Sequence, residues 1–288
     1  MPASTLDLHT HTCFSDGKFS PSELLHYAAS IGLQTIAITD HDNTNGVREA
    51  LALAQDLGLE LIPAIELTCQ WPQCEPLPGD GDIDVLGYFV DLENPEFQAF
   101  ERAALDDIHL RTADCCASLT AEGHPVTLQE VFAENQHYAG VLQLILAVIK
   151  KGHAEDWGAA FKMVAEKWAQ VRLSHFTIQE VIGAIHSAGG VAVLAHPVLV
   201  KCNGNRLREK DLLQLKEMGL DGLEIFHPRL DEEARSYFSA LAKRLNLLVS
   251  GGSDEHGWFT DFENIGSQPV TSEVLESLRR RHIEWTNL

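Results

Sequence analysis

The chain has 288 residues, of which 45% are hydrophobic and 22% charged, and its formal net charge is −21 at pH 7. This length is enough to bury a full core, either as one large domain or as one domain with an insertion. The acidic charge argues against a broad face that binds long nucleic acid, and no apolar run approaches the ~20 residues that span a bilayer. With six irregularly spaced cysteines, these features favour a cytoplasmic protein with reduced thiols and no membrane partner. The oligomeric state stays open.

The first predicted strand leads into a stretch, residues 7–17, that is rich in metal-binding side chains. His9 and His11 are two residues apart, so a strand points both imidazoles to one face. Asp16 follows beside Gly17, where the chain can turn. Packing does not require two nitrogens and a carboxylate at the exit of a strand, but a divalent metal does.

Two further strands, each preceded by a helix, are predicted next. The expected elements are a helix over 22–30 with a Ser20–Glu23 capping box, a strand over 35–39, a helix over 46–57 and a strand over 60–65. His41 follows the first of these strands and Glu66 follows the second. In parallel α/β folds, the C-terminal ends of the strands form the rim on which sites are built. A further strand over 82–90 carries Asp84.

The middle of the chain is predicted to be helical, with almost no strand signal. The expected helices cover 97–122, 127–134, 141–150 and 157–168. We interpret 97–175 as an inserted helical lobe, and 1–96 plus 176–288 as the metal-binding barrel domain.

The alternation of strands and helices resumes after the lobe. Helices are expected over 177–188, 210–218 and 232–245, strands over 191–195, 222–226 and 247–250, and a helix near the C-terminus. His196, His227, Asp254 and His256 follow these three strands. Glu224 lies three residues before His227 on its strand, so we expect it to point elsewhere.

The polar groups at the strand ends combine nitrogen and carboxylate ligands without cysteine. They are His9, His11, Asp16, His41, Glu66, Asp84, His196, His227, Asp254 and His256. This chemistry suits zinc, manganese or iron, rather than a structural zinc site or a calcium site. The groups are too many for one ion, so we expect two or three divalent metal ions that share a bridging carboxylate. Of Asp40 and Asp42, one could accept an imidazole N–H and the other could cap the following helix.

Five motifs in order give the chain a specific resemblance. Asp-Leu-His-Thr-His, Ile-Thr-Asp-His-Asp, Pro-Ala-Ile-Glu-Leu, Leu-Ala-His-Pro and Gly-Gly-Ser-Asp-Glu-His resemble the motifs of the PHP (polymerase and histidinol phosphatase) family, over about 5–96 and 176–260. The resemblance implies an α/β fold, a distorted (β/α)7 barrel. The helical insertion resembles the small lobe of the branch that contains nucleoside 3′,5′-bisphosphate phosphatases and 5′–3′ exoribonucleases.

The resemblance also implies three metal subsites. One metal would be held by His9, His11, Glu66 and Asp254, a second by Glu66 as the bridge with His196, and a third by Asp16, His41 and His256. The second subsite normally takes a histidine where this chain has Asp84. A carboxylate there is shorter and more charged, which favours a weaker, absent or harder metal such as manganese. The alternative to a metal-binding role is that Asp84 is a strand residue that faces solvent.

Predictions for substrate contacts depend on a departure from the family pattern. The lobe of the branch usually carries an Arg-Pro-His-like segment, and its counterpart here is Asn135-Gln136-His137, without the arginine. Arg172, Lys201 and Arg206 could supply the charge, or each could be a plain surface cation. His227 resembles a family position near the substrate phosphate. We assign His227 and Asp254 catalytic roles, and His227, Asn135, Arg172, Lys201 and Arg206 substrate binding.

These residues favour a metal-dependent phosphoesterase. The reaction we expect is hydrolysis of a phosphomonoester by a metal-bound hydroxide, on a small phosphorylated substrate such as a nucleoside 3′,5′-bisphosphate. The alternatives are a phosphodiesterase or 5′–3′ exonuclease on short oligoribonucleotides, a catalytically degenerate metal-binding regulator, and, more remotely, an amidohydrolase.

Overall fold

Seven strands form one barrel-like sheet in a computed structural model that describes residues 4–71, 83–171, 174–202, 204–258 and 264–287. Their order is β1 (Leu6–Asp7), β2 (Thr35–Ile38), β3 (Glu60–Cys69), β4 (Ile83–Tyr88), β5 (Val191–Leu194), β8 (Gly222–Phe226) and β9 (Leu248–Gly251). Beyond β1 and β9 the chain continues the pairing, because Thr10 bridges Glu255 in parallel and the Asp254 N–H donates to the His9 carbonyl at 2.9 Å. The sheet is therefore nearly closed, which confirms the predicted barrel.

Strand β4 runs antiparallel to both of its neighbours, β3 and β5. Asp84 is the second residue of β4 and lies opposite Thr68 of β3. Because β4 is reversed, its beginning lies at the rim where the parallel strands end. Asp84 therefore reaches the same rim as the other predicted ligands from the opposite end of its strand.

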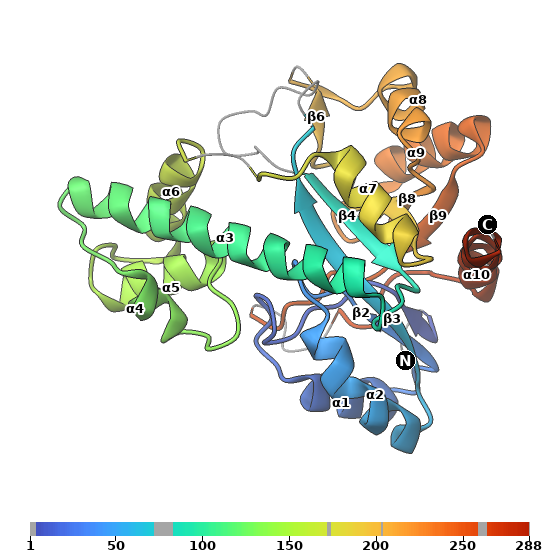
Figure 1. Cartoon of the computed structure of the whole chain (residues 1–288), viewed down its shortest axis with the longest axis horizontal. Helices are drawn as coiled ribbons and strands as arrows, with labels where there is room; N and C mark the ends of the chain where they lie inside the picture. The colour runs from blue at the N-terminus through green and yellow to red at the C-terminus, as the bar shows by residue number, and fades with distance from the viewer. Residues whose placement is uncertain (1–3, 72–82, 172–173, 203, 259–263, 288) are drawn as a thin grey trace.

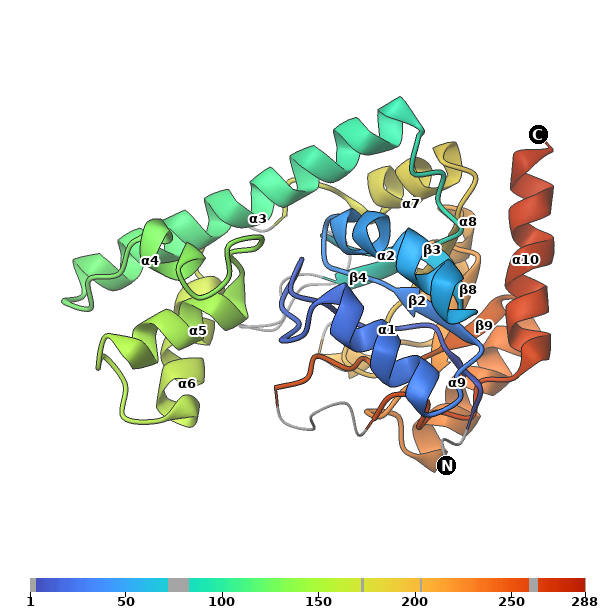
Figure 2. The same cartoon turned by 90° about the horizontal axis from the view of Figure 1, so that it is seen from below.

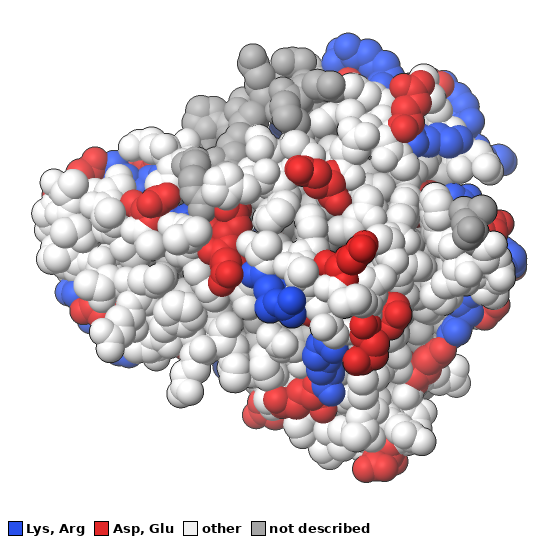
Figure 3. Space-filling view, in the orientation of Figure 1, with Lys and Arg blue, Asp and Glu red and all other residues white. Residues whose placement is uncertain are grey.

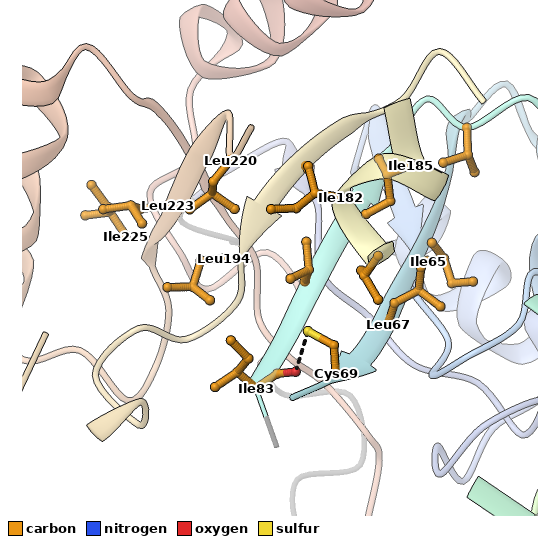
Figure 4. Packing of buried hydrophobic residues seen from close by; sticks show 14 of the residues in the cluster. Ile65, Leu67, Cys69, Ile83, Ile182, Ile185, Leu194, Leu220, Leu223 and Ile225 are labelled. Atoms are coloured by element: carbon orange, nitrogen blue, oxygen red, sulfur yellow. Dashed lines mark hydrogen bonds between the residues drawn. The ribbon is translucent and has the colours of Figure 1, made fainter. Parts of the chain in front are cut away.

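Strand β3 extends to Cys69, four residues beyond the predicted end at 65, so Glu66 lies inside the strand and not after it. Side chains alternate across a strand. Ile65, Leu67 and Cys69 pack outward into the core shared with helix α7 (Ile178–Ser187), as Figure 4 shows, and Ile62 and Ala64 belong to a second core inside the barrel. Glu66 shares the inward face, which is what directs its carboxylate into the barrel.

Helices cover the outside of the barrel (Figures 1 and 2). They are α1 (Pro21–Ser30), α2 (Asn45–Leu57), α7, α8 (Glu209–Glu217), α9 (Glu232–Leu245) and α10 (Ser272–Thr286). The predicted capping box is present, because the Ser20 hydroxyl accepts from the Glu23 N–H while Glu23 accepts from the Ser20 N–H. A short hairpin of β6 (Lys201–Cys202) and β7 (Asn205–Arg206) was not predicted.

Four helices project from one side of the barrel (Figures 1 and 2). They are α3 (Pro95–Ala121), α4 (Leu128–Phe132), α5 (Val141–Lys150) and α6 (Trp157–Trp168), and their inner faces share a separate hydrophobic core. The first half of α3 packs with the barrel, because Phe97 and Ala104 belong to the main core. Glu101 of α3 also accepts hydrogen bonds from the Thr44 N–H and hydroxyl at the start of α2. Helix α3 is thus shared by the barrel and the lobe.

On the face shown in Figure 3, lysine and arginine side chains occur in separate groups interspersed with acidic ones, rather than as one continuous strip. Within the part of the chain that the structure describes, no helix combines the length and apolarity needed to cross a membrane.

Candidate metal centre

The structure brings the nine predicted metal ligands together at the rim in three groups. They are His9, His11, Glu66 and Asp254; Glu66, Asp84 and His196; and His11, Asp16, His41 and His256. Within each group, the ligand atoms lie within 4.8 Å of one another. Glu66 belongs to two groups and is buried between them, which is the position of a bridging carboxylate.

The first group is the most compact and the most buried. The Nε2 atom of His9 lies 3.1 Å from Glu66 Oε2 and 3.3 Å from Asp254 Oδ1. The Nε2 atom of His11 lies 3.3 Å from each of the same two oxygens. The side chains of His9 and His11 are fully buried. Two nitrogens and two oxygens thus point at one small volume.

Among the residues that the structure describes, the second group has three protein donors. Glu66 Oε1 lies 3.0 Å from His196 Nε2, and Asp84 Oδ2 lies 3.9 Å from the same nitrogen. The Thr68 hydroxyl donates to Asp84 Oδ1 at 2.9 Å, which leaves Oδ2 facing the group. Asp84 therefore points toward the predicted metal position and not into solvent.

The third group surrounds Asp16. Its Oδ1 atom lies 3.2 Å from His256 Nε2, and its Oδ2 atom lies 4.0 Å from His41 Nε2. The imidazole of His11 stacks between those of His256 and His41, with ring centroids 4.0 and 4.8 Å away.

Two observations fit these residues to bound metal ions. His41 Nδ1 is a buried atom without a hydrogen-bond partner among the described residues, and such an atom is costly unless a ligand satisfies it. His196 and Asp254 also have positive φ angles of 28° and 52°, a backbone region that non-glycine residues rarely adopt and that is concentrated at functional sites.

Electrostatics in the centre holds the shared carboxylate of Glu66 charged. Burial raises the pKa of Glu66, but His9 and His41 outweigh it and bring the pKa well below its usual value. Burial lowers the pKa of His41, but Glu66 and Asp16 raise it to about 9. Burial likewise lowers the pKa of His256, but Asp16 and Asp254 raise it to about 10. In the metal-free protein, protons therefore occupy nitrogens that metal ions need.

Glu224 is part of the centre, and the expectation that it points elsewhere was wrong. Its Oε1 atom lies 2.8 Å from His9 Nδ1, and its Oε2 atom accepts the His196 backbone N–H at 2.8 Å. The prediction assumed that side chains alternate regularly from Glu224 to His227. Strand β8 instead has a register irregularity between Glu224 and Phe226 and ends before His227. Glu224 thus orients one ligand by its ring and another by its backbone.

Asp40 and Asp42 have different uses from those expected. Asp40 accepts from the Thr12 N–H, the Thr12 hydroxyl and the Ser15 hydroxyl at 2.6–2.7 Å, so it holds the loop between His11 and Asp16. Asp42 accepts from the Thr68 N–H at 3.0 Å. Neither expected role, imidazole acceptor or helix cap, is the one that these bonds give the two carboxylates.

The lobe also donates hydrogen bonds to the loop between His11 and Asp16. Asn135 Nδ2 donates to the carbonyls of Cys13 and Ser15 at 2.9 and 2.7 Å. From the barrel, the Trp258 indole N–H donates to the Asp16 carbonyl at 2.6 Å. The predicted substrate residue Asn135 thus has its amide nitrogen engaged in holding the backbone that carries Asp16.

The remaining predicted substrate residues differ in their placement. Lys201 donates to the Val198 carbonyl at 3.0 Å, and the Arg206 guanidinium stacks 3.8 Å from the ring centroid of Tyr237 on α9. Arg172 lies outside the described residues. His227 is buried against the centre, with Nε2 3.1 Å from Asp254 Oδ2 and Nδ1 accepting the Arg229 N–H at 3.0 Å.

A cavity of about 200 Å³ lies between the third ligand group and the lobe, and we call it the lobe cavity. Asp16, His41 and Asp84 line it from the barrel, and Arg111, Tyr138 and Trp168 line it from the lobe. Arg111 is almost completely buried, with its guanidinium 4.6 Å from the Trp168 ring centroid.

Arg111 was not predicted as a site residue, although the sequence pattern of α3 contains a signal for it. Phe97, Ala104, Ile108, Cys115 and Leu119 form a buried stripe with helical spacing. Arg111 falls within this stripe. A charged residue in an apolar stripe of a helix indicates a buried polar role.

Comparison with known proteins agrees with this geometry. Residues 7–214 match the PHP domain family. The chain is 31% identical over 270 residues to the 5′-3′ exoribonuclease of Haemophilus influenzae, covering 90% of this chain and 93% of that protein. It is 26% identical over 257 residues to the 3′,5′-nucleoside bisphosphate phosphatase of Chromobacterium violaceum, covering 88% and 87%.

Solved structures resemble the whole chain. A protein from Bifidobacterium adolescentis, assigned as a metal-dependent phosphoesterase, superposes with a TM-score of 0.82 at 29% identity, covering 97% of both chains. An amidohydrolase from Chromobacterium violaceum shares the fold, with a TM-score of 0.80 at 24% identity over 96% of this chain and 97% of that one.

The barrel, the ligand groups and these similarities define the class as metal-dependent phosphoesterases, hydrolases that act on phosphate esters. Within that class, the chain belongs to the PHP domain family.

Proposed function

We propose that the protein hydrolyses a phosphomonoester of a small nucleotide, such as a nucleoside 3′,5′-bisphosphate. The observation that carries this proposal is the set of three adjoining ligand groups, two of which share Glu66, beside a cavity that is lined by a buried arginine. Bound manganese, zinc or iron ions would supply a hydroxide nucleophile at neutral pH and neutralise the phosphoryl oxygens. The protein's own side chains bind and orient the substrate.

In this proposal, the lobe cavity receives the nucleoside and its second phosphate. Arg111 is the cation that stands in for the arginine missing at Asn135, because it lines the cavity together with Tyr138. The fixed planar guanidinium of arginine suits a phosphate better than an ammonium group does. On the opposite wall lie Asp16, His41 and Asp84, which are metal ligands, so the scissile phosphate would lie at that wall.

We assign His227 and Asp254 to catalysis as a pair of residues that act together. With Nδ1 accepting the Arg229 N–H, the His227 proton lies on Nε2 and faces Asp254 Oδ2. This contact fixes the orientation of the Asp254 carboxylate toward the first ligand group. It also makes His227 a local source of a proton for the departing oxygen, with water as the other source.

A second candidate is hydrolysis of the phosphodiester bonds of short oligoribonucleotides from the 5′ end. It is supported by the 31% identity to a 5′-3′ exoribonuclease over 90% of the chain. The same ligand groups would serve, since they act on the phosphate and not on the organic part. A degenerate regulator, in contrast, has no use for all nine ligands and the buried carboxylate of Glu224.

The test is phosphate release by protein loaded with manganese, zinc or iron. A panel of nucleoside bisphosphates, nucleoside monophosphates and sugar phosphates should give the fastest release from a nucleoside bisphosphate. Absence of phosphate release from the whole panel would contradict the proposal. Mononucleotide products from a 5′-phosphorylated oligoribonucleotide would identify the second candidate.

A further inference from the structure

A second cavity, of about 270 Å³, adjoins the metal ligands away from the lobe, and we call it the rim cavity. It is formed by residues 227–229, which follow β8, and by residues 253–258 and 264, which follow β9. Its lining includes His227, Arg229, Asp254, His256, Trp258 and Asn264. When a phosphomonoester bound in the lobe cavity is hydrolysed, as proposed above, no part of the substrate fills the rim cavity.

The two cavities meet at the third ligand group. Asp16 lines the lobe cavity and His256 lines the rim cavity, and their side chains are 3.2 Å apart. A phosphate held at these ligands therefore has one cavity on each side. A phosphomonoester has a single organic substituent and fills one of them, whereas a phosphodiester has two and fills both.

The lining of the rim cavity suits one unit of a nucleic acid chain. Trp258 supplies an aromatic ring whose orientation is fixed by the bond from its indole N–H to the Asp16 carbonyl. Arg229 is an exposed cation at the same cavity, and its backbone N–H is held by His227. A fixed aromatic ring beside a cation is the combination that proteins use to bind single-stranded nucleotides, by stacking on the base and contact with the backbone.

We propose that the rim cavity is a subsite for the nucleotide on the 3′ side of the scissile phosphate, stacked on Trp258 and contacted by Arg229. This inference rests on the proposed hydrolysis of phosphate esters at the metal ligands. The same bond breaks in both substrates: the hydroxyl of water adds to phosphorus, the P–O3′ bond breaks, and its electron pair stays on O3′, which takes a proton. The phosphate departs free from a bisphosphate, or still attached to the nucleotide in the rim cavity.

The experiment compares a nucleoside 3′,5′-bisphosphate with a 5′-phosphorylated dinucleotide on the manganese-loaded full chain. The dinucleotide differs by the unit assigned to the rim cavity. Arg229→Gln and Trp258→Leu should each lower kcat/KM for the dinucleotide about ten-fold relative to the bisphosphate, mainly through KM. Trp258→Phe keeps a ring and should recover most of this ratio, although it loses the bond to Asp16. Arg244→Gln, which changes an exposed arginine on α9, is the matched control.

The possible outcomes separate this inference from the proposed function. Equal losses on both substrates would assign Trp258 only to support of Asp16, and would overturn the subsite. Turnover of the bisphosphate without turnover of the dinucleotide would also overturn it. If neither compound is hydrolysed, the proposed function fails. Equilibrium dialysis of the dinucleotide then tests the cavity alone, and equal binding by wild type, Arg229→Gln and Trp258→Leu would overturn it.

Discussion

Oε1 of Glu224 lies 2.8 Å from Nδ1 of His9, and both side chains are fully buried. The contact leaves Nε2 of His9 to face Glu66 and Asp254. A histidine that binds a metal usually donates its other ring N–H to such an acceptor, which fixes the ring and makes it a better ligand. Glu224 is therefore a positioning residue for the most compact ligand group.

Glu224→Gln should weaken metal binding by about 10- to 100-fold, because the neutral amide polarises His9 less and leaves the His196 N–H with a poorer partner. Metal content after dialysis against a graded series of free manganese measures this change. Glu217→Gln, at an exposed position on α8, is the control and should bind as the wild type does. An unchanged affinity in Glu224→Gln would remove the assigned role.

Asn135→Ala should reduce the metal content of the third group, because the Cys13 carbonyl then loses its bond from Asn135 and the Ser15 carbonyl is left with the longer bond, 3.4 Å, from Gln143 of α5. Elemental analysis at limiting manganese should find fewer ions per chain than in the wild type. The neighbouring exposed residue gives a matched control, Gln136→Ala. Full metal content with a raised KM would instead support the original prediction that Asn135 contacts the substrate.

Asp84 should set the metal preference of the second group. A carboxylate in place of a histidine favours a harder ion, so the ratio of zinc to manganese affinity should be higher in Asp84→His than in the wild type. Competition dialysis with both ions measures the ratio. Asp84→Ala should lose one bound ion, because Glu66 and His196 are then the two donors left to this group among the described residues. Equal ratios in wild type and Asp84→His would show that Asp84 is not a ligand.

Metal binding should release protons at neutral pH. In the metal-free protein, burial lowers the pKa of His196, but Glu66 and Asp84 raise it to about 9, and the pKa of His256 is raised to about 10. These pKa values lie above the ordinary value of 6.5, so the stability they contribute is complete below about pH 6.5 and is lost as pH rises through 9 to 10. Apparent metal affinity should therefore rise with pH from 6 to 9.

Calorimetry in two buffers of different ionisation enthalpy counts these protons, and thermal unfolding checks the linked stability. The melting temperature of the metal-free protein should fall between pH 7 and 10, while that of the metal-loaded protein should change less. Metal binding without proton release at pH 7 would contradict the assigned charge states.

Much of this architecture could be predicted because its determinants are local. The capping box predicted for Ser20 and Glu23 is present, and Thr127 and Thr177 begin their helices with the same arrangement, in which the two partners are three residues apart. The rim ligands could be found because parallel strands all end at one edge, so residues distant in sequence meet there. Glu66 was correctly placed among the rim ligands, but it lies inside β3 and not after it. The sequence did not show that β3 continues to Cys69.

The rest depends on contacts between distant segments, which a pattern within one element does not encode. The direction of the Glu224 side chain was predicted wrongly because the regular alternation of side chains does not continue through the irregular end of β8. Arg111 meets the barrel through the packing of a 27-residue helix, and Trp258 meets Asp16 across 242 positions of the chain. Such residues could be recognised only once the barrel had closed.

The most direct test of the central claim is the rate of phosphate release from a nucleoside 3′,5′-bisphosphate, with metal content measured on the same samples. Wild type loaded with manganese should turn the substrate over, and removal of metal by a chelator should abolish the reaction reversibly. The double variant His9→Ala/His11→Ala should lose at least about a thousand-fold in kcat, together with bound metal, because it removes both nitrogens of the first group. Full activity in that double variant would contradict the assignment of this rim as the site of phosphate ester hydrolysis.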